Sequence, residues 1–144
     1  MVKISKSKEM LTSVDKAWGL ISDVDNDSKY WSQIRDIKVT KAERNTVERD
    51  ATVGPKTFSH KSHQVLVFDP KKTIKLTMMG GPMDGERTIT LVPLGKNSTR
   101  IDVEWDLKLK DVPGFVQTIV KGQIGKATEG ALDKLAKVAE GGKA

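Results

Sequence analysis

The clearest pattern in the chain is a strict alternation of apolar and charged residues over residues 98–110. Its apolar members are Ile101, Val103, Trp105, Leu107 and Leu109. A period of two predicts a strand with one face buried and the other in water. A turn at residues 111–114 and one long helical pattern follow. This order predicts a curved sheet with a helix lying across its inner face.

Six other segments have strand patterns, although two lysines interrupt the apolar side of the first. They are residues 2–10, 37–44, 46–53, 57–68, 73–79 and 86–93. Ser13 is a predicted N-cap of a short helix, and a second short helix is expected to carry Tyr30, Trp31 and Ile34. Residues 80–85 are expected to form a hairpin loop. No long helical pattern separates the later strands, so an antiparallel meander is predicted.

The last helical pattern begins at Pro113, which suits a first-turn position, and Gly141-Gly142 ends it. One broad apolar face recurs at about 100° per residue. It comprises Val116, Ile119, Val120, Gln123, Ile124, Ala127, Ala131, Leu135 and Val138. Gly122 and Gly125 are expected to lie off this face. The predicted fold class is α+β.

Composition narrows the class of protein. The chain has 144 residues, of which 37% are hydrophobic, a length that fits one domain over residues 1–144. It has no cysteine, no run of about 18 apolar residues and no charged-then-apolar leader, so we expect a cytoplasmic protein. The 25 basic and 19 acidic residues give a charge of +6, which favours anionic partners such as a membrane surface.

Parity along the strands separates candidate interior residues from solvent-facing ones. If Ile89 and Leu91 point inward, then so does Arg87, and a buried guanidinium requires a partner or a ligand group. Gln123 lies on the inward face of the last helix and is a candidate polar ligand contact. The residues expected to bind a ligand are Trp31, Leu76, Met78, Arg87, Ile89, Val103, Trp105, Ile119 and Gln123.

The two histidines do not form an obvious catalytic or metal site. His60 and His63 are three residues apart on a predicted strand, so their side chains should point to opposite faces. One of them could act as an acid or base in a cavity. No catalytic residue, cofactor or metal site is assigned from the sequence. The few aromatic residues are not interleaved with a basic stripe, so nucleic-acid binding is not expected.

Three local motifs resemble the SRPBCC superfamily. Trp18, Asp23 and Trp31 are similar to its opening pattern, and Phe68-Asp69-Pro70 is similar to its strand–turn–strand motif. Residues 91–95 with residues 98–101 resemble its proline-containing hairpin. The superfamily includes START lipid-transfer, polyketide cyclase/dehydrase-like and coenzyme Q-binding proteins. This resemblance implies a helix-grip fold with seven curved strands, two short helices and a long C-terminal helix enclosing a cavity.

Three functions remain open at this point. The first is binding of a hydrophobic small molecule, such as a lipid, isoprenoid or quinone, with peripheral contact with an anionic membrane. The second is a cyclase/dehydrase-type enzyme that uses an acid–base residue in the same cavity, drawn from one histidine, Asp84, Glu86 and Arg87. The third is a protein-interaction module that uses the charged outer face of the sheet. Because fold alone does not give function, the site must decide among them.

Overall fold

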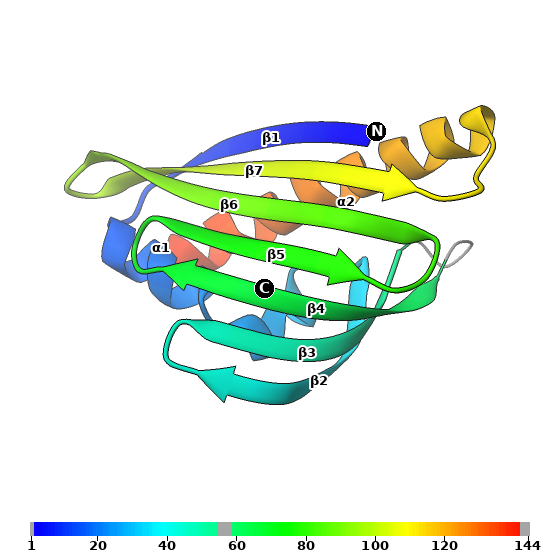
Figure 1. The fold of residues 1–144 in the computed structure, drawn as a ribbon. Coiled ribbons are helices and arrows are strands. Elements are labelled where there is room, and N and C mark those ends of the chain that lie inside the picture. The colour runs from blue at the N-terminus through cyan, green and yellow to red at the C-terminus, as the bar shows by residue number, and fades with distance from the viewer. Residues whose placement is uncertain (1, 55–58, 142–144) are drawn as a thin grey trace.

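Seven strands form one antiparallel sheet in the computed structural model, which describes residues 2–54 and 59–141. Their order across the sheet is β1-β7-β6-β5-β4-β3-β2, so only β1 leaves the sequential meander and pairs with β7. The strands are β1 (Val2–Met10), β2 (Ile34–Glu43), β3 (Thr46–Val53), β4 (His60–Asp69), β5 (Thr73–Met79), β6 (Met83–Gly95) and β7 (Ser98–Leu109). Figure 1 shows the helices together behind the sheet.

Within residues 2–54 and 59–141, three helices accompany the sheet. Helix α1 (Val14–Ile21) begins as expected, because the Ser13 hydroxyl accepts a hydrogen bond of 3.2 Å from the Lys16 backbone N–H. Helix α2 (Gly114–Ala139) runs for 26 residues and is preceded by Pro113. This arrangement is the helix-grip fold that the sequence predicts.

The second short helix differs from the prediction. It is a 3₁₀ helix, η1 (Val24–Lys29), and it ends before Tyr30 and Trp31. Ile34 is the first residue of β2 and not part of a helix. The acidic run at residues 23–27 favours this short element over a full α-helix, because Asp and Asn compete for nearby backbone groups.

The loop after β5 is also shorter than predicted. Strand β6 begins at Met83, so Gly85 lies within the sheet and pairs with Leu107. Gly85 has φ +147°, and a Cβ there would overlap the Asp106 carbonyl oxygen. The predicted start of the fourth strand at residue 57 and the helix-ending Gly142 lie outside the described residues.

The two lysines that interrupt the apolar side of β1 have partners on α2. Lys6 Nζ lies 2.6 Å from a carboxylate oxygen of Glu129, and Lys8 Nζ lies 2.9 Å from one of Asp133. The helix approaches β1 closely here, since a Cβ on Gly125 would lie 3.6 Å from the Lys6 Cε. Gly125 is therefore buried against the sheet, and the prediction that it lies off the packed face is wrong.

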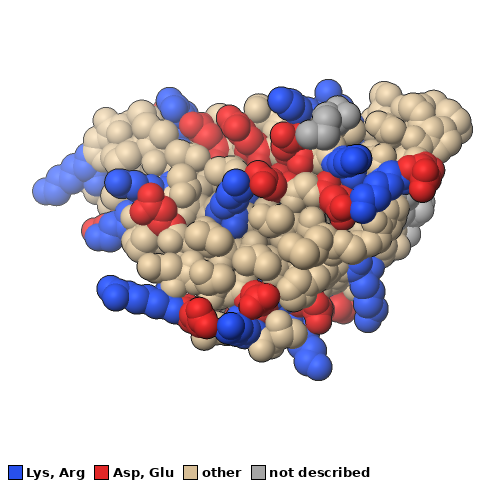
Figure 2. Space-filling model, in the orientation of Figure 1, with Lys and Arg blue, Asp and Glu red and all other residues tan. Residues whose placement is uncertain are grey.

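The outer face of the sheet is charged, and both signs are mixed on it. The alternation along β7 is confirmed: the residues with the parity of Trp105 are buried, and those with the parity of Asp102 reach solvent. Figure 2 shows Lys and Arg interspersed with Asp and Glu over this face, with uncharged surface between them. Within the described part of the chain, no helix is both long enough and apolar enough to cross a membrane.

Candidate functional site

Most residues expected to line an internal cavity are buried core side chains. The six apolar ones among them are between 0% and 5% exposed and belong to one packed cluster. They are Trp31, Leu76, Met78, Ile89, Val103 and Trp105. Ile119 differs, because its side chain is 56% exposed near the N-terminal end of α2. The prediction that Ile119 faces inward is therefore wrong.

Arg87 lies in the interior, as strand parity predicts, and it is only 1% exposed. Its guanidinium carbon is 4.5 Å from the centroid of the Trp31 ring and 5.7 Å from that of Trp105. The two indole rings meet edge to face, with centroids 6.1 Å apart. A cation within about 6 Å of an aromatic face is attracted by the ring quadrupole. The two tryptophans therefore provide part of the stabilisation that a buried guanidinium needs.

A second arginine is buried beside the first. Arg49 on β3 is 0% exposed, and its three donor nitrogens are all engaged. Nε donates to Gln64 Oε1 at 2.7 Å, Nη1 donates to the Val24 carbonyl at 2.7 Å, and Nη2 donates to Asp27 Oδ2 at 2.9 Å. Arg49 thus ties β3 and β4 to helix η1.

The charges in this cluster do not balance. The carboxylate of Asp27 pairs with Arg49 and lies 3.6 Å from Arg87 Nη2, so two guanidinium groups share one carboxylate. Burial lowers the pKa of Arg87 to about 10. The negative charge of Asp27 opposes this change, and the positive charge of Arg49 adds to it. Arg87 therefore stays protonated at neutral pH. Its Nε and Nη1 make no hydrogen bond within the described residues.

An unpaired donor in the interior is costly, because burial removes the water that the group would bond to and no protein acceptor replaces it. Gln64 Nε2 in the same cluster also lacks a partner within the described residues. The cluster therefore has hydrogen-bond donors and a surplus positive charge available. A carbonyl or anionic oxygen would satisfy both.

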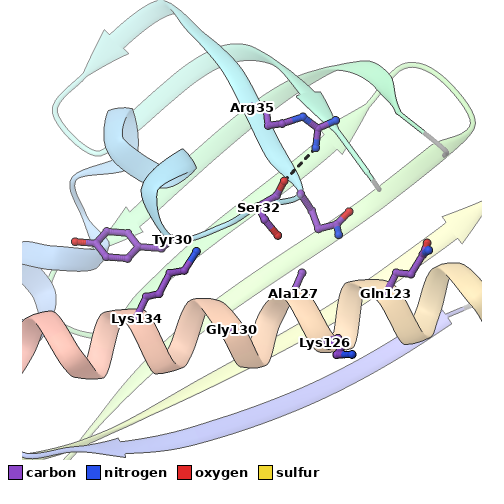
Figure 3. A pocket seen from close by; sticks show the side chains of 9 residues that line it. Tyr30, Ser32, Arg35, Gln123, Lys126, Ala127, Gly130 and Lys134 are labelled. Atoms are coloured by element: carbon purple, nitrogen blue, oxygen red, sulfur yellow. Dashed lines mark hydrogen bonds between the residues drawn. The ribbon is translucent and has the colours of Figure 1, made fainter. Parts of the chain in front are cut away.

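An open groove of about 490 Å³ separates α2 from the segment that leads into β2. Figure 3 shows the helix forming one wall and residues 30–35 forming the other. The wall from that segment comprises Tyr30, Ser32, Gln33 and Arg35, and the wall from α2 comprises Gln123, Lys126, Ala127, Gly130 and Lys134. Of the nine residues predicted to bind ligand, Gln123 is the one that lines this groove.

The groove and the arginine cluster are joined through two tryptophans. Trp31 belongs to the groove segment by sequence, but its ring packs on Arg87 in the interior. The Trp105 indole N–H donates to the Thr128 hydroxyl at 2.9 Å, and Thr128 follows the groove residue Ala127. A molecule in the groove therefore lies against elements that also hold the buried guanidinium.

Comparison with known proteins places the chain in a family. The model of the family described as polyketide cyclase / dehydrase and lipid transport matches residues 1–140. The chain belongs to this family. Membership of a lipid transport family implies binding of a hydrophobic ligand in generic terms, without naming the ligand. A comparison with curated proteins finds no match.

Solved structures agree on the fold of this family member. A Thermus thermophilus protein superposes with a TM-score of 0.80 at 14% identity, covering 93% of this chain and 94% of that one. A START superfamily protein from Mycobacterium smegmatis gives 0.78 at 19% identity, with coverage of 94% and 97%. The Zhui aromatase/cyclase from Streptomyces gives 0.69 at 11% identity, with coverage of 96% and 87%.

Most of the acid–base candidates in this family member lie outside the core. His63 shares the outward parity of β4, where Asp50 Oδ1 lies 2.9 Å from its Nδ1, and Asp50 together with Glu48 raises its pKa. Lys110, 2.6 Å from Asp84, lowers the pKa of that outward-facing carboxyl. His60 has the inward parity. Among the described residues, no three His, Asp or Glu side chains gather as metal ligands.

The sequence did not single out three residues of the buried cluster, Arg49, Gln64 and Asp27. Arg49 has the same parity on β3 as the buried Ala51 and Val53, so the argument that placed Arg87 inside also applies to it. Asp27 gave no such signal, because it lies in an irregular acidic run where periodicity carries no information. Only the tertiary structure brings it under the two arginines.

Proposed function

We propose that this protein binds a hydrophobic small molecule, such as a lipid, isoprenoid or quinone, between α2 and the sheet. The ligand enters by the groove along residues 30–35, and a carbonyl or anionic oxygen on it meets Arg87. Apolar burial supplies most of the affinity, at about 25 cal/mol per Å² removed from water. A few polar groups then fix the orientation, among them Arg87, Gln123 and Tyr30.

One observation carries this proposal: Arg87 is buried, charged and left with two unpaired nitrogens. A residue that served the fold alone would be better replaced by an apolar side chain of similar size. The interior side chains of the protein are packed against one another. The ligand therefore reaches Arg87 when the segment of residues 30–35, which carries Trp31, moves aside. Family membership supports the hydrophobic character of the ligand.

The Arg87→Met substitution tests the role of this residue. We expect the free energy of unfolding to stay unchanged or to rise by up to about 2 kcal/mol, because Asp27 remains paired with Arg49. Ligand occupancy should fall about tenfold or more, since the buried polar anchor is lost. Chemical denaturation gives the stability, and native mass spectrometry of protein expressed in its source organism gives the occupancy.

Arg100→Met is the matched control. Arg100 lies on the outer face of β7 and is bonded to Asp102, so its loss should change stability by about 0.5 kcal/mol or less and leave occupancy unchanged. Wild-type protein that carries no hydrophobic mass would overturn the binding proposal. Ligand that stays equally bound to the Arg87→Met variant would overturn the role of Arg87 alone.

The enzyme alternative has less support from the site. It needs a proton donor or acceptor inside the core, and the named carboxylates Asp84 and Glu86 lie on the outward parity of β6. Glu86 and Asp84 are both paired with lysines there. The interaction-module alternative rests on the mixed-charge outer face, which is typical of a solvated surface (Figure 2).

We also propose that this protein, which we take to be cytoplasmic, docks on anionic membranes through the N-terminal end of α2. Phe115 and Ile119 are 73% and 56% exposed, one helical turn apart, and Lys126 continues the same helical face into the groove. Exposed apolar side chains beside lysines on a chain of charge +6 suit a surface of acidic lipids.

The double substitution Phe115→Ser and Ile119→Ser should weaken binding to phosphatidylcholine vesicles containing phosphatidylserine by about tenfold, measured by co-sedimentation. Leu11→Ser is the control, because Leu11 is 74% exposed but lies outside α2. Equal binding by the double variant and the wild type would contradict this docking surface. Binding that is no stronger to vesicles with phosphatidylserine than without it would contradict the choice of an anionic membrane.

A further inference from the structure

The groove is lined by three cationic side chains and no carboxylate. Arg35 stands on one wall, and Lys126 and Lys134 stand on the other, as Figure 3 shows. Within the described residues, no Asp or Glu lies within ion-pair distance of either lysine. The nearby carboxylates of α2 are already engaged, since Glu129 and Asp133 pair with the lysines of β1. The positive charge of the groove is therefore not neutralised by the protein.

Arg35 is also held in place. Its Nη1 donates to the carbonyls of Ser32 and Gly54 at 3.0 and 3.1 Å, and its Nη2 donates to the Ser59 hydroxyl at 2.8 Å. All three acceptors are neutral, so they fix the guanidinium without cancelling its charge. A preorganised cation loses less conformational entropy when an anion binds.

Two amide groups add neutral polar positions to the groove. The Oε1 atoms of Gln33 and Gln123 are buried and have no hydrogen-bond partner within the described residues. Buried acceptors of this kind usually bond to something, and a ligand hydroxyl or N–H would supply the donor. Tyr30 and Ala127 supply apolar surface between the charged positions.

We infer that the natural ligand is an amphiphile with an anionic head group, a carboxylate or a phosphate ester. The head group lies between Arg35, Lys126 and Lys134, and the mainly apolar body runs along Tyr30 and Ala127 toward Trp31, where a carbonyl oxygen on it meets Arg87. This inference rests on the proposed binding function and adds the chemical class of the ligand. Opposite charges in a partly enclosed groove attract more strongly than on an open surface.

The test compares a fluorescent acid with its neutral ester. Dansylaminoundecanoic acid and its methyl ester share a tail and differ in charge, so their dissociation constants isolate the head-group contribution. We expect the acid to bind about tenfold more tightly than the ester at low ionic strength, and added salt should narrow the difference. Displacement by dodecanoate and by dodecyl phosphate then shows which head group the groove prefers.

Charge-removing variants locate the effect. Lys126→Gln combined with Lys134→Gln should weaken binding of the acid about two- to fivefold for each lysine and leave the ester unchanged. Lys137→Gln is the control, because Lys137 is an exposed lysine of the same helix that does not line the groove. It should leave both dissociation constants as they are.

The outcomes separate the two proposals. Equal binding of acid and ester would overturn the anionic head group and leave the proposed binding of a hydrophobic molecule standing. A preference for the acid that is undiminished in the double lysine variant would overturn the assignment to this groove. If neither probe binds and no hydrophobic mass co-purifies, the proposed function fails, and the head-group inference fails with it.

Discussion

The Asp27→Asn substitution is expected to lower the free energy of unfolding by about 3–5 kcal/mol. Among the described residues, Asp27 is the one carboxylate that meets both buried arginines, with Arg49 Nη2 at 2.9 Å and Arg87 Nη2 at 3.6 Å. Asparagine keeps the shape and an acceptor oxygen but removes the negative charge. Two guanidinium groups then remain buried with no countercharge, which costs far more than a surface ion pair.

Urea denaturation compares the free energies of unfolding of the Asp27→Asn and Asp25→Asn variants. Asp25 lies in the same 3₁₀ helix but is exposed, so the same chemical change should alter stability there by about 0.5 kcal/mol or less. If both variants unfold at the same urea concentration, the buried charges do not depend on Asp27, and the description of the cluster is wrong.

A double variant keeps the test informative even when Asp27→Asn alone does not fold. Adding Arg87→Met removes one of the two unbalanced cations, so it should recover about 1 kcal/mol or more of the lost stability. The electrostatic coupling between these positions is the part of this recovery that exceeds the effect of Arg87→Met in the wild type. A recovery no larger than the wild-type effect of Arg87→Met would place the damage in the packing of η1 rather than in the charge balance.

The strand pattern predicted the sheet because one face of it lies in water. Along β7 the contrast between buried and charged positions is complete, and the predicted strand of residues 98–110 is Ser98–Leu109 in the structure. The lysines of β1 interrupt this contrast because they pair with residues of α2. Lys6 reaches Glu129 and Lys8 reaches Asp133, each more than a hundred residues later in the chain. Periodicity cannot identify such partners.

The candidate site was only half predictable for a related reason. Parity gives the direction of a side chain and correctly placed Arg87 inside, but it does not say whether the inside is filled or empty. Most residues expected to line a cavity turned out to be packed core, while the open space lies between α2 and residues 30–35. That space depends on how a helix and an irregular segment meet, and neither has a sequence pattern that encodes their separation.

The second large effect is expected from Gly130→Leu, which should fill the groove without harming the fold. Nothing lies within 4 Å of a Cβ built on Gly130, so the new side chain meets open space and not the core. Leucine is also a better helix former than glycine, and stability should rise by about 0.8 kcal/mol. A ligand would have to share the groove with four added carbons, which should weaken its binding by about ten- to a hundredfold.

Gly122→Leu is the matched control for this variant. Gly122 is another glycine of α2 with nothing within 4 Å of its Cβ, but it does not line the groove. It should gain the same helical stability and keep full affinity for dansylaminoundecanoic acid and for the co-purified ligand. Because both variants become more stable, a loss of binding confined to Gly130→Leu could come only from occupation of the groove. Unchanged binding in Gly130→Leu would instead mean that the ligand reaches the interior by another route.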